Sequence, residues 1–148
     1  MSVKSQNIDP SFYNSLEESE KYAWSLLEAG IKDRKSYFHT PVVISKSKLG
    51  TVSPRTMVLR GVNQTALELQ FHTDRRSNKV NELALNKIGA ILVYDMATKV
   101  QVRIEAEFRI VNNANTLEER WSKMGSMSKE CYAVSKPPGF EVQDPSNL

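Results

Sequence analysis

The sequence has very little of what disulfide-stapled or membrane-inserted proteins require. Its single cysteine, Cys131, cannot form an intramolecular disulfide, which excludes a secreted disulfide scaffold and favours a reducing compartment. The longest apolar run, residues 90–94, is far shorter than a bilayer span, and the N-terminal segment lacks the apolar stretch of a signal peptide. We therefore expect a cytoplasmic protein that does not insert into membranes.

The motifs of several common enzyme classes are also missing. The two histidines, His39 and His72, have no cysteine or carboxylate at metal-ligand spacing, so no metal site is predicted. There is no G-x-S-x-G elbow or comparable cysteine signature of a nucleophilic enzyme. There is no G-x-G-x-x-G or Walker sequence either, so a bound nucleotide would not lie on a Rossmann or P-loop platform. The motifs thus leave the catalytic residues unknown.

What the sequence does contain is the composition of one globular domain. With 148 residues, 40% of them hydrophobic and 25% charged, the chain can bury a single core, and we expect one domain over residues 1–148. The net charge of +3 is small, but positive charge is concentrated in residues 51–80. The basic residues of that stretch are Arg55, Arg60, Arg75, Arg76 and Lys79, and the acidic ones are Glu68 and Asp74.

The hydrophobic pattern predicts one long helix followed by strands. Ser15 and Glu18 form the S-x-x-E pattern of a capping box, and a helix is expected over about residues 15–30, with Gly30 as its stop. Apolar residues at helical spacing begin with Leu16. Five segments rich in β-branched and aromatic residues follow, at residues 39–48, 51–62, 66–73, 88–96 and 99–111. The last alternates apolar and polar residues most clearly.

Two further helices are predicted, at residues 77–87 and from Thr116, where Glu119 repeats the capping pattern. Residues 136–148 resemble an extended, proline-rich tail. The short polar connections between strands favour antiparallel hairpins. The sequence therefore predicts a mainly β fold, a small and partly open antiparallel barrel with a few peripheral helices.

The basic cluster follows the strand that ends near Thr73. A strand, a tight loop and a helix starting at Ser77 make a natural anion site, because free backbone N–H groups and the positive end of the helix dipole point to one place. Ser77 can cap that helix, and Arg76 and Lys79 would add charge suited to a phosphate monoester. Arg55 could reach the same place if its strand pairs with residues 66–73. The alternative is a solvated helix start.

Three separated segments resemble the flavin-binding core of one family. The segments "PRTMVLRGV", "LQFHTDRRSNK" and "VQVRIEAEFRIV" are similar, in order and spacing over roughly residues 40–125, to those of the pyridoxamine 5'-phosphate oxidase-like FMN-binding split barrels. The resemblance implies an antiparallel split barrel of Greek-key type with FMN as cofactor. It also implies a role as an oxidoreductase, because FMN itself carries the electron chemistry.

The resemblance assigns cofactor contacts residue by residue. It implies that Arg55, Ser77 and Lys79 hold the FMN phosphate, that the backbone of "MVL" borders the isoalloxazine, that Thr73 helps to hold the cofactor, and that Gln101 bonds the ring. The implied cofactor-binding residues are Arg55, Thr56, Met57, Val58, Leu59, Arg60, His72, Thr73, Arg76, Ser77, Asn78, Lys79 and Gln101. Gln101 could otherwise be an ordinary exposed strand residue.

The resemblance fails at the substrate end. True oxidases of this family hold the substrate phosphate with a Tyr and an Arg in the helix after the last matched strand, where this chain offers Arg120 or Trp121 and Met124. A Gln-Ser pair that touches FMN is replaced by Pro137 and Pro138, and the C-terminal arginine and histidine motif has no counterpart. We therefore expect an oxidase-related protein with an unknown small-molecule substrate that turns over pyridoxine 5'-phosphate poorly.

Other functions stay open from the sequence. The chain could be a non-catalytic FMN carrier or sensor, or a binding module for another phosphorylated ligand. Nucleic acid is not an expected partner, because no exposed row of stacking aromatics accompanies the basic residues. Apolar residues on both faces of "GAILVY" and "TMVL", together with the resemblance, predict a homodimer whose interface completes the FMN sites.

Overall fold

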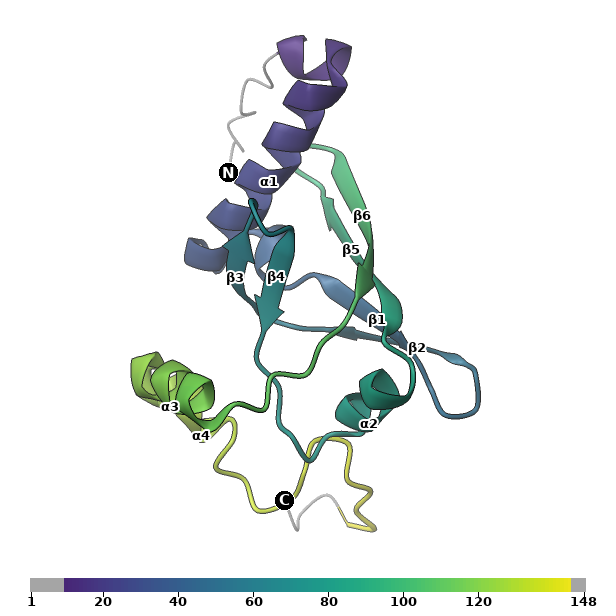
Figure 1. The fold of residues 1–148 in the computed structure, drawn as a ribbon, viewed down its shortest axis with the longest axis vertical. Helices are drawn as coiled ribbons and strands as arrows, with labels where there is room; N and C mark the ends of the chain where they lie inside the picture. Colours follow the sequence, from purple (N-terminus) through teal and green to yellow (C-terminus); the bar gives the residue numbers. More distant parts are fainter. Residues whose placement is uncertain (1–9, 145–148) are drawn as a thin grey trace.

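The computed structural model describes residues 10–144 and shows a mixed α/β architecture rather than the expected mainly β one. Two short 3-10 turns, η1 (Pro10–Asn14) and η2 (Tyr37–His39), flank the long helix α1 (Leu16–Lys32). The strands are β1 (Val42–Lys46), β2 (Val52–Thr56), β3 (Leu59–Asn63), β4 (Glu68–Phe71), β5 (Ile88–Asp95) and β6 (Val100–Glu107). The remaining helices are α2 (Asn78–Leu85), α3 (Ala114–Lys123) and α4 (Ser126–Glu130). In Figure 1, α1 lies at one end of the molecule and α2, α3 and α4 lie at the other.

Helix α1 begins where the capping pattern predicts and ends later than predicted. The Ser15 hydroxyl accepts a hydrogen bond from the Glu18 backbone N–H at 3.3 Å. Gly30 does not stop the helix but is buried within it. A Cβ atom at Gly30 would lie 2.6 Å from the carbonyl carbon of Phe38, so the glycine is needed for the close approach of η2.

The strands form two antiparallel sheets, one with the order β2-β1-β5-β6 and one with β3-β4. The three predicted hairpins are confirmed. The single strand predicted over residues 51–62 is wrong, because the chain leaves the first sheet after Thr56 and enters the second at Leu59. No pairing between described strands closes a barrel. Met57 and Val58 therefore bridge the two sheets.

The hydrophobic core connects α1 to both sheets. Leu27 of α1, Phe38 of η2, Leu59 of β3 and Val93 of β5 form one buried cluster. Burying side chains of this size stabilises the fold by about 1.5–3 kcal/mol each. Leu16, predicted on the apolar face of α1, is instead 90% exposed. Because Leu59 belongs to this core, the crossing between the sheets is fixed at its β3 end.

Strand β6 confirms the alternation predicted from its sequence. Val102, Ile104 and Ala106 are partly buried, whereas the intervening residues are exposed. Gln101 lies on the exposed face, on the strand at the opposite edge of its sheet from β2.

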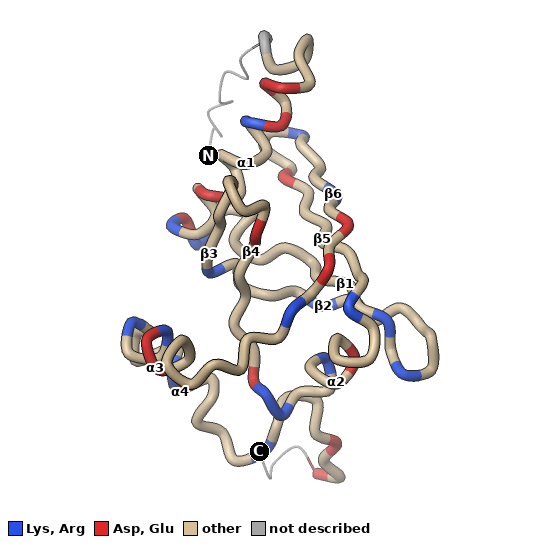
Figure 2. The backbone as a smooth tube through the Cα atoms, viewed as in Figure 1, with Lys and Arg blue, Asp and Glu red and all other residues tan. Residues whose placement is uncertain are grey.

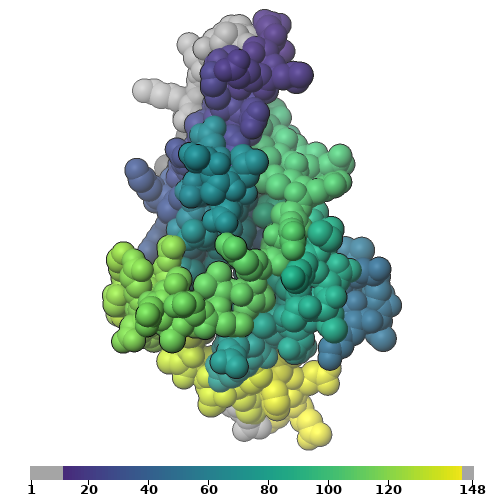
Figure 3. All heavy atoms as spheres, in the orientation of Figure 1, coloured from purple at the N-terminus to yellow at the C-terminus, as the bar shows by residue number. Residues whose placement is uncertain are grey.

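The C-terminal helices differ from the prediction at their start. Asn113, not Thr116, caps α3, and its side chain accepts a hydrogen bond from the Thr116 backbone N–H at 3.1 Å. Helix α4 was not predicted, and neither α3 nor α4 contains a buried residue. Figure 3 shows α3, α4 and the described residues that follow them, up to residue 144, toward one end of the molecule. Within residues 10–144, no helix is both long enough and apolar enough to span a bilayer.

Candidate functional site

A cavity of about 210 Å³ opens beside the crossing between the two sheets. Its walls come from that crossing, the end of β4, the start of α2 and the segment that follows α4. The residues that line it are Thr56, Met57, Val58, His72, Thr73, Asp74, Lys79, Cys131, Tyr132 and Pro138. Candidate cofactor residues from two separated segments thus face one space.

Polar groups gather at the N-terminus of α2. Ser77 occupies the N-cap position, but its hydroxyl donates to the backbone carbonyl of Asp74 at 2.7 Å and makes no cap hydrogen bond, contrary to prediction. The same hydroxyl lies 3.3 Å from Oγ1 of Thr73. The Val80 N–H donates to the Ser77 carbonyl at 3.0 Å, so the N–H groups of Asn78 and Lys79 are the ones left for an anion at the positive end of the helix dipole.

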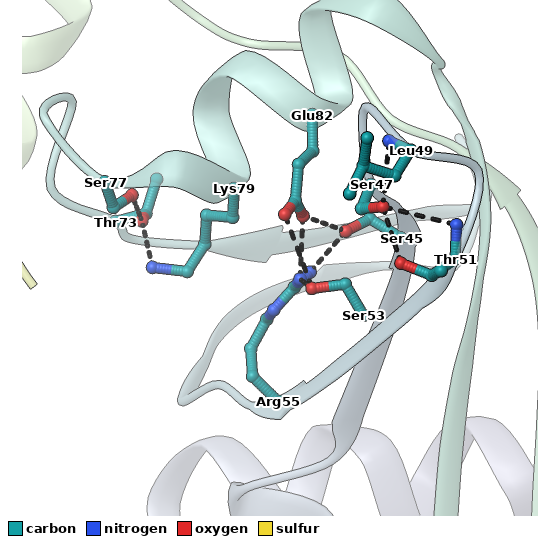
Figure 4. Close-up of polar contacts among 10 residues, drawn as sticks. All are labelled: Ser45, Ser47, Leu49, Thr51, Ser53, Arg55, Thr73, Ser77, Lys79 and Glu82. Carbon is teal, nitrogen blue, oxygen red and sulfur yellow. Dashed lines mark hydrogen bonds and ion pairs between the residues drawn. The ribbon is translucent and has the colours of Figure 1, made fainter. Parts of the chain in front are cut away.

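Lys79 extends from the first turn of α2 toward the same place. Its Nζ donates to Oγ1 of Thr73 at 3.2 Å, and Figure 4 shows these two side chains together with Ser77. Burial lowers the pKa of Lys79, and the positive charge of Arg55 lowers that pKa further. Within residues 10–144, no carboxylate forms an ion pair with Lys79. A partly buried cation of this kind is suited to an anionic ligand.

Arg55 reaches this region by a different route from the one predicted. Its strand, β2, pairs with β1 and not with β4. Arg55 Nη2 lies 2.8 Å from Oε2 of Glu82, and Nη1 donates to the Ser45 hydroxyl at 2.6 Å. Nη2 also donates to the Ser53 hydroxyl. Figure 4 shows this cluster next to Lys79, with Glu82 descending from the same helix.

Glu82 is a site residue that the sequence analysis missed. Burial alone would raise its pKa, but hydrogen bonds from Ser45 and Arg55 and the charge of Arg55 outweigh burial, so the pKa is lowered and the carboxylate is ionised. Its position three residues after Lys79 places both side chains on one face of α2. That spacing is the signal that could have identified it.

Arg76, predicted as a cofactor residue, makes all its hydrogen bonds to protein groups. Its Nη2 lies 2.7 Å from Oδ2 of Asp74, and the side-chain hydrogen bond from Arg76 is the main reason that the pKa of Asp74 is lowered. The guanidinium also donates to the backbone carbonyls of Val134 and Ser135 at 3.0 and 3.1 Å. Arg76 therefore ties the segment after α4 to the loop before α2. Figure 2 shows Lys and Arg positions following an acidic position between β4 and α2.

His72, one of the residues that line the cavity, has an unsatisfied polar atom. Among the described residues, its Nδ1 is the buried side-chain N or O atom without a hydrogen-bond partner. Burial lowers the pKa of His72, and the charges of Arg60 and Arg120 lower it further, so the imidazole is neutral at neutral pH. A buried nitrogen without a partner is the kind of atom that a polar ligand satisfies.

Several predicted residues lie outside the cavity wall. Leu59 is fully buried in the core, Asn78 is exposed, and Gln101 is exposed on β6. Arg75 is also exposed, which agrees with the solvated interpretation for that residue. Of the residues predicted to hold the phosphate, Lys79 lines the cavity whereas Arg55 and Ser77 are not among its lining residues, and Gln101 lies elsewhere on β6.

The far wall of the cavity was also missed. It is formed by Cys131, Tyr132 and Pro138, and burial raises the pKa of Tyr132. No local pattern connects these residues to Thr56 or His72, because their proximity depends on how the chain returns after α4. Arg76 helps to hold the returning chain, because its guanidinium donates to the backbone carbonyls of Val134 and Ser135.

The family to which the site residues point is established by comparison. The model of the family described as pyridoxamine 5'-phosphate oxidase, FMN-binding domain, matches residues 21–112. The chain belongs to this family. The match in this pyridoxamine 5'-phosphate oxidase-type domain includes every candidate from Arg55 to Gln101 and ends before α3, so the far wall of the cavity lies outside it.

Solved structures support the same fold. A pyridoxamine 5'-phosphate oxidase-related, FMN-binding protein from Nostoc punctiforme matches with a TM-score of 0.65 and 17% identity, over 91% of this chain and 69% of that one. PhzG from Burkholderia lata, crystallised with tetrahydrophenazine-1-carboxylic acid, matches with a TM-score of 0.73 and 16% identity, over 97% and 69%. At these identities the likeness shows the fold alone. No curated protein matches the chain.

Proposed function

We propose that this chain binds FMN in the cavity between its two sheets and acts as an oxidoreductase related to pyridoxamine 5'-phosphate oxidase. The observation that carries the proposal is the contact of Lys79 with Thr73, and of Thr73 with Ser77, on the wall of a cavity bounded by Met57 and Val58. An anion-binding end and an apolar crossing in one space suit a phosphorylated aromatic cofactor.

The phosphate would be held by the start of α2. The N–H groups of Asn78 and Lys79 would face it, since that of Val80 already donates to the Ser77 carbonyl, and Lys79 forms no ion pair with a carboxylate within the described chain. An anion beside Lys79 would favour its charged form and so reverse the lowering of its pKa. Arg55 would add a second cation from β2.

The ring would lie against the crossing between the sheets. Met57 and Val58 offer apolar surface there, and the neutral imidazole of His72, which also lines the cavity, has a buried Nδ1 without a hydrogen-bond partner among the described residues. FMN, when bound, supplies the electron transfer, while these residues position it and exclude water. This division of work is consistent with a site that shows no catalytic triad or carboxylate pair.

The substrate is proposed to differ from that of the true oxidases. The far wall, with Cys131, Tyr132 and Pro138, lies outside the family match, and Met124 stands near where a phosphate-binding arginine is expected. Losing one charged partner for a phosphate removes about 2–5 kcal/mol of binding. Pyridoxine 5'-phosphate should therefore be oxidised slowly or not at all, and turnover at ordinary oxidase rates would contradict this assignment.

We also propose that two copies of the chain complete the site. A cavity of about 210 Å³ is smaller than the roughly 300–1,000 Å³ that encloses a ligand of this size, and Gln101 is outside it. A second chain related by a twofold axis could supply both the missing wall and the ring contact. Light scattering at low micromolar concentration tests this: a stable monomer that binds FMN stoichiometrically would refute the shared site.

An absorbance spectrum of the purified protein is the direct test of the cofactor. Flavin bands, with FMN rather than FAD or riboflavin released on denaturation, are the expected result. A protein purified without flavin should regain these bands with added FMN, and failure to bind FMN would refute the proposal. Reduction of the bound flavin by NAD(P)H and reoxidation by a small acceptor would separate an oxidoreductase from an FMN carrier or sensor.

A further inference from the structure

We propose that Glu82 is a positioning residue, which holds Arg55 in a fixed place beside Lys79 so that a phosphate meets two cations already in position. This inference rests on the proposed function, because the phosphate is taken to be that of FMN. It assigns a role to an acidic residue on the helix that begins at the anion site.

Glu82 contacts Arg55 directly and also contacts the two serines to which Arg55 donates. Oε2 accepts from Arg55 Nη2 at 2.8 Å and from the Ser45 hydroxyl at 2.6 Å, while Oε1 accepts from the Ser53 hydroxyl at 3.4 Å. The two serines also accept hydrogen bonds from Arg55 itself. Three elements, β1, β2 and α2, thus meet at this guanidinium, which fixes its orientation.

The same contacts leave part of Arg55 available to a ligand. Of its N–H donors, one on Nη1 and both on Nη2 are used, so Nε and the second Nη1 hydrogen have no partner among residues 10–144. In Figure 4 the Lys79 ammonium lies on the side of Arg55 away from Ser45 and Ser53. A phosphate between Arg55 and Lys79 would therefore find free donors on Arg55 without displacing Glu82.

Charge explains why a carboxylate is useful at a phosphate site. Arg55 and Lys79 repel one another: burial lowers the pKa of Lys79, and the charge of Arg55 lowers that pKa further. The charge of Glu82 acts on Lys79 in the opposite direction. With side-chain exposures of 18% for Arg55 and 14% for Glu82, solvent screens the pair only partly. Glu82 therefore offsets part of the repulsion between the two cations before any phosphate arrives.

Two other roles for Glu82 make different predictions. A carboxylate that merely competes with phosphate for Arg55 would weaken FMN binding, so that its removal would tighten binding. A carboxylate that merely fastens α2 to the sheet would, when removed, weaken the binding of any ligand in the cavity. A positioning residue affects a ligand only through its phosphate.

The experiment titrates the full-length, flavin-free protein with FMN and with riboflavin, which lacks the phosphate, and follows flavin fluorescence. The variants are Glu82→Ala, Glu82→Gln, Arg55→Ala and the double variant Arg55→Ala/Glu82→Ala. Glu68→Ala is the matched control, because Glu68 forms an exposed ion pair with Arg109. Thermal unfolding of each variant checks that it is folded.

We expect Glu82→Ala to weaken FMN binding about tenfold, which is the size of effect typical of two residues coupled in one hydrogen-bond network, here Glu82 and Arg55. Riboflavin binding should stay within about twofold of the wild-type affinity. Glu82→Gln, which keeps an oxygen acceptor for Arg55, should recover part of the loss. In the Arg55→Ala background, Glu82→Ala should have no further effect. Glu68→Ala should change neither affinity.

The inference is overturned if Glu82→Ala binds FMN as tightly as the wild type or more tightly, or if it loses FMN and riboflavin equally. If Arg55→Ala weakens FMN binding but neither Glu82 variant does, the proposed function stands and only the role of Glu82 fails. A wild-type protein that binds no FMN at all refutes the proposed function and this inference with it.

Discussion

The two walls of the cavity are built in different ways. One wall, the crossing from β2 to β3, continues directly into the core, since Leu59 is fully buried against Leu27 and Phe38. The other wall follows α4, in a region where neither helix has a buried residue, and it is held in part by two hydrogen bonds from Arg76 to backbone carbonyls.

This difference indicates which cavity residues can be substituted without loss of the fold. Residues that face the core and the cavity together, as on the crossing, are fixed by packing, which penalises small changes of volume. Residues of the outer wall are constrained less by packing, since α3 and α4 before it contain no buried residue. The family match covers the first wall and stops before the second. The proposed FMN site therefore uses the rigid wall, and the proposed change of substrate uses the weakly packed one.

The largest effect is expected from the core. Phe38→Ala should lower the free energy of unfolding by about 3–5 kcal/mol, because Phe38 is fully buried and its removal leaves a cavity. Phe140→Ala in the tail, where the ring is 52% exposed, should change stability by no more than about 0.5 kcal/mol. Urea unfolding measures both variants. Equal losses would show that the two regions are packed alike.

The next effect concerns the phosphate end of the rigid wall. Lys79→Glu should weaken FMN binding by about 2–5 kcal/mol, because it puts an anion where the phosphate would lie. Lys87→Glu reverses an exposed charge just beyond the other end of α2 and serves as the control. Fluorescence titration gives both affinities. An unchanged affinity in Lys79→Glu would count against the phosphate assignment.

A smaller effect on stability is expected when the pH is lowered, because His72 becomes protonated. The pKa of His72 is lowered in the folded protein, so the unfolded chain, with a pKa of about 6.5, takes up a proton at a higher pH than the folded one. Stability should therefore fall as the pH decreases from about 6.5 toward the lower folded pKa. His72→Gln should reduce this dependence. Unfolding midpoints that fall equally with pH in both proteins would contradict the prediction.

The smallest effect on global stability is expected at the outer wall. Arg76→Lys keeps a positive charge beside Asp74, but one ammonium cannot reproduce the planar fork that also reaches Val134 and Ser135. Limited proteolysis should cut the segment after α4 sooner, while the melting temperature stays near that of the wild type. Arg75→Lys, at an exposed neighbour, is the control. Unchanged proteolysis would mean that other contacts hold this wall.

Much of the anion end could be predicted because its geometry is local. Thr73, Ser77 and Lys79 lie within seven residues, and a strand followed by a loop and a helix brings them together. The sequence correctly predicted Ser77 at the N-cap position of α2. The predicted cap hydrogen bond to the Ser77 hydroxyl is wrong, because that hydroxyl donates to the backbone carbonyl of Asp74 instead. Element type followed from the residue pattern, while the choice of hydrogen-bond partner depended on the loop conformation.

The sequence by itself determined the local features of this protein. They include the cap of α1 at Ser15, the three antiparallel hairpins, the alternation along β6, and the strand, loop and helix at the proposed anion site. Each depends on residues within a few positions of one another, so hydrogen bonding and side-chain periodicity suffice to specify it.

Tertiary packing sets how these parts meet. It divided residues 51–62 between two sheets, placed Gly30 against Phe38, paired Arg55 with Glu82, and brought the segment after α4 to Arg76. The partners in these last three contacts lie between 8 and 59 positions apart in the sequence. Contacts of this kind are set by the packing of whole elements around the core, so no short pattern of residues contains them.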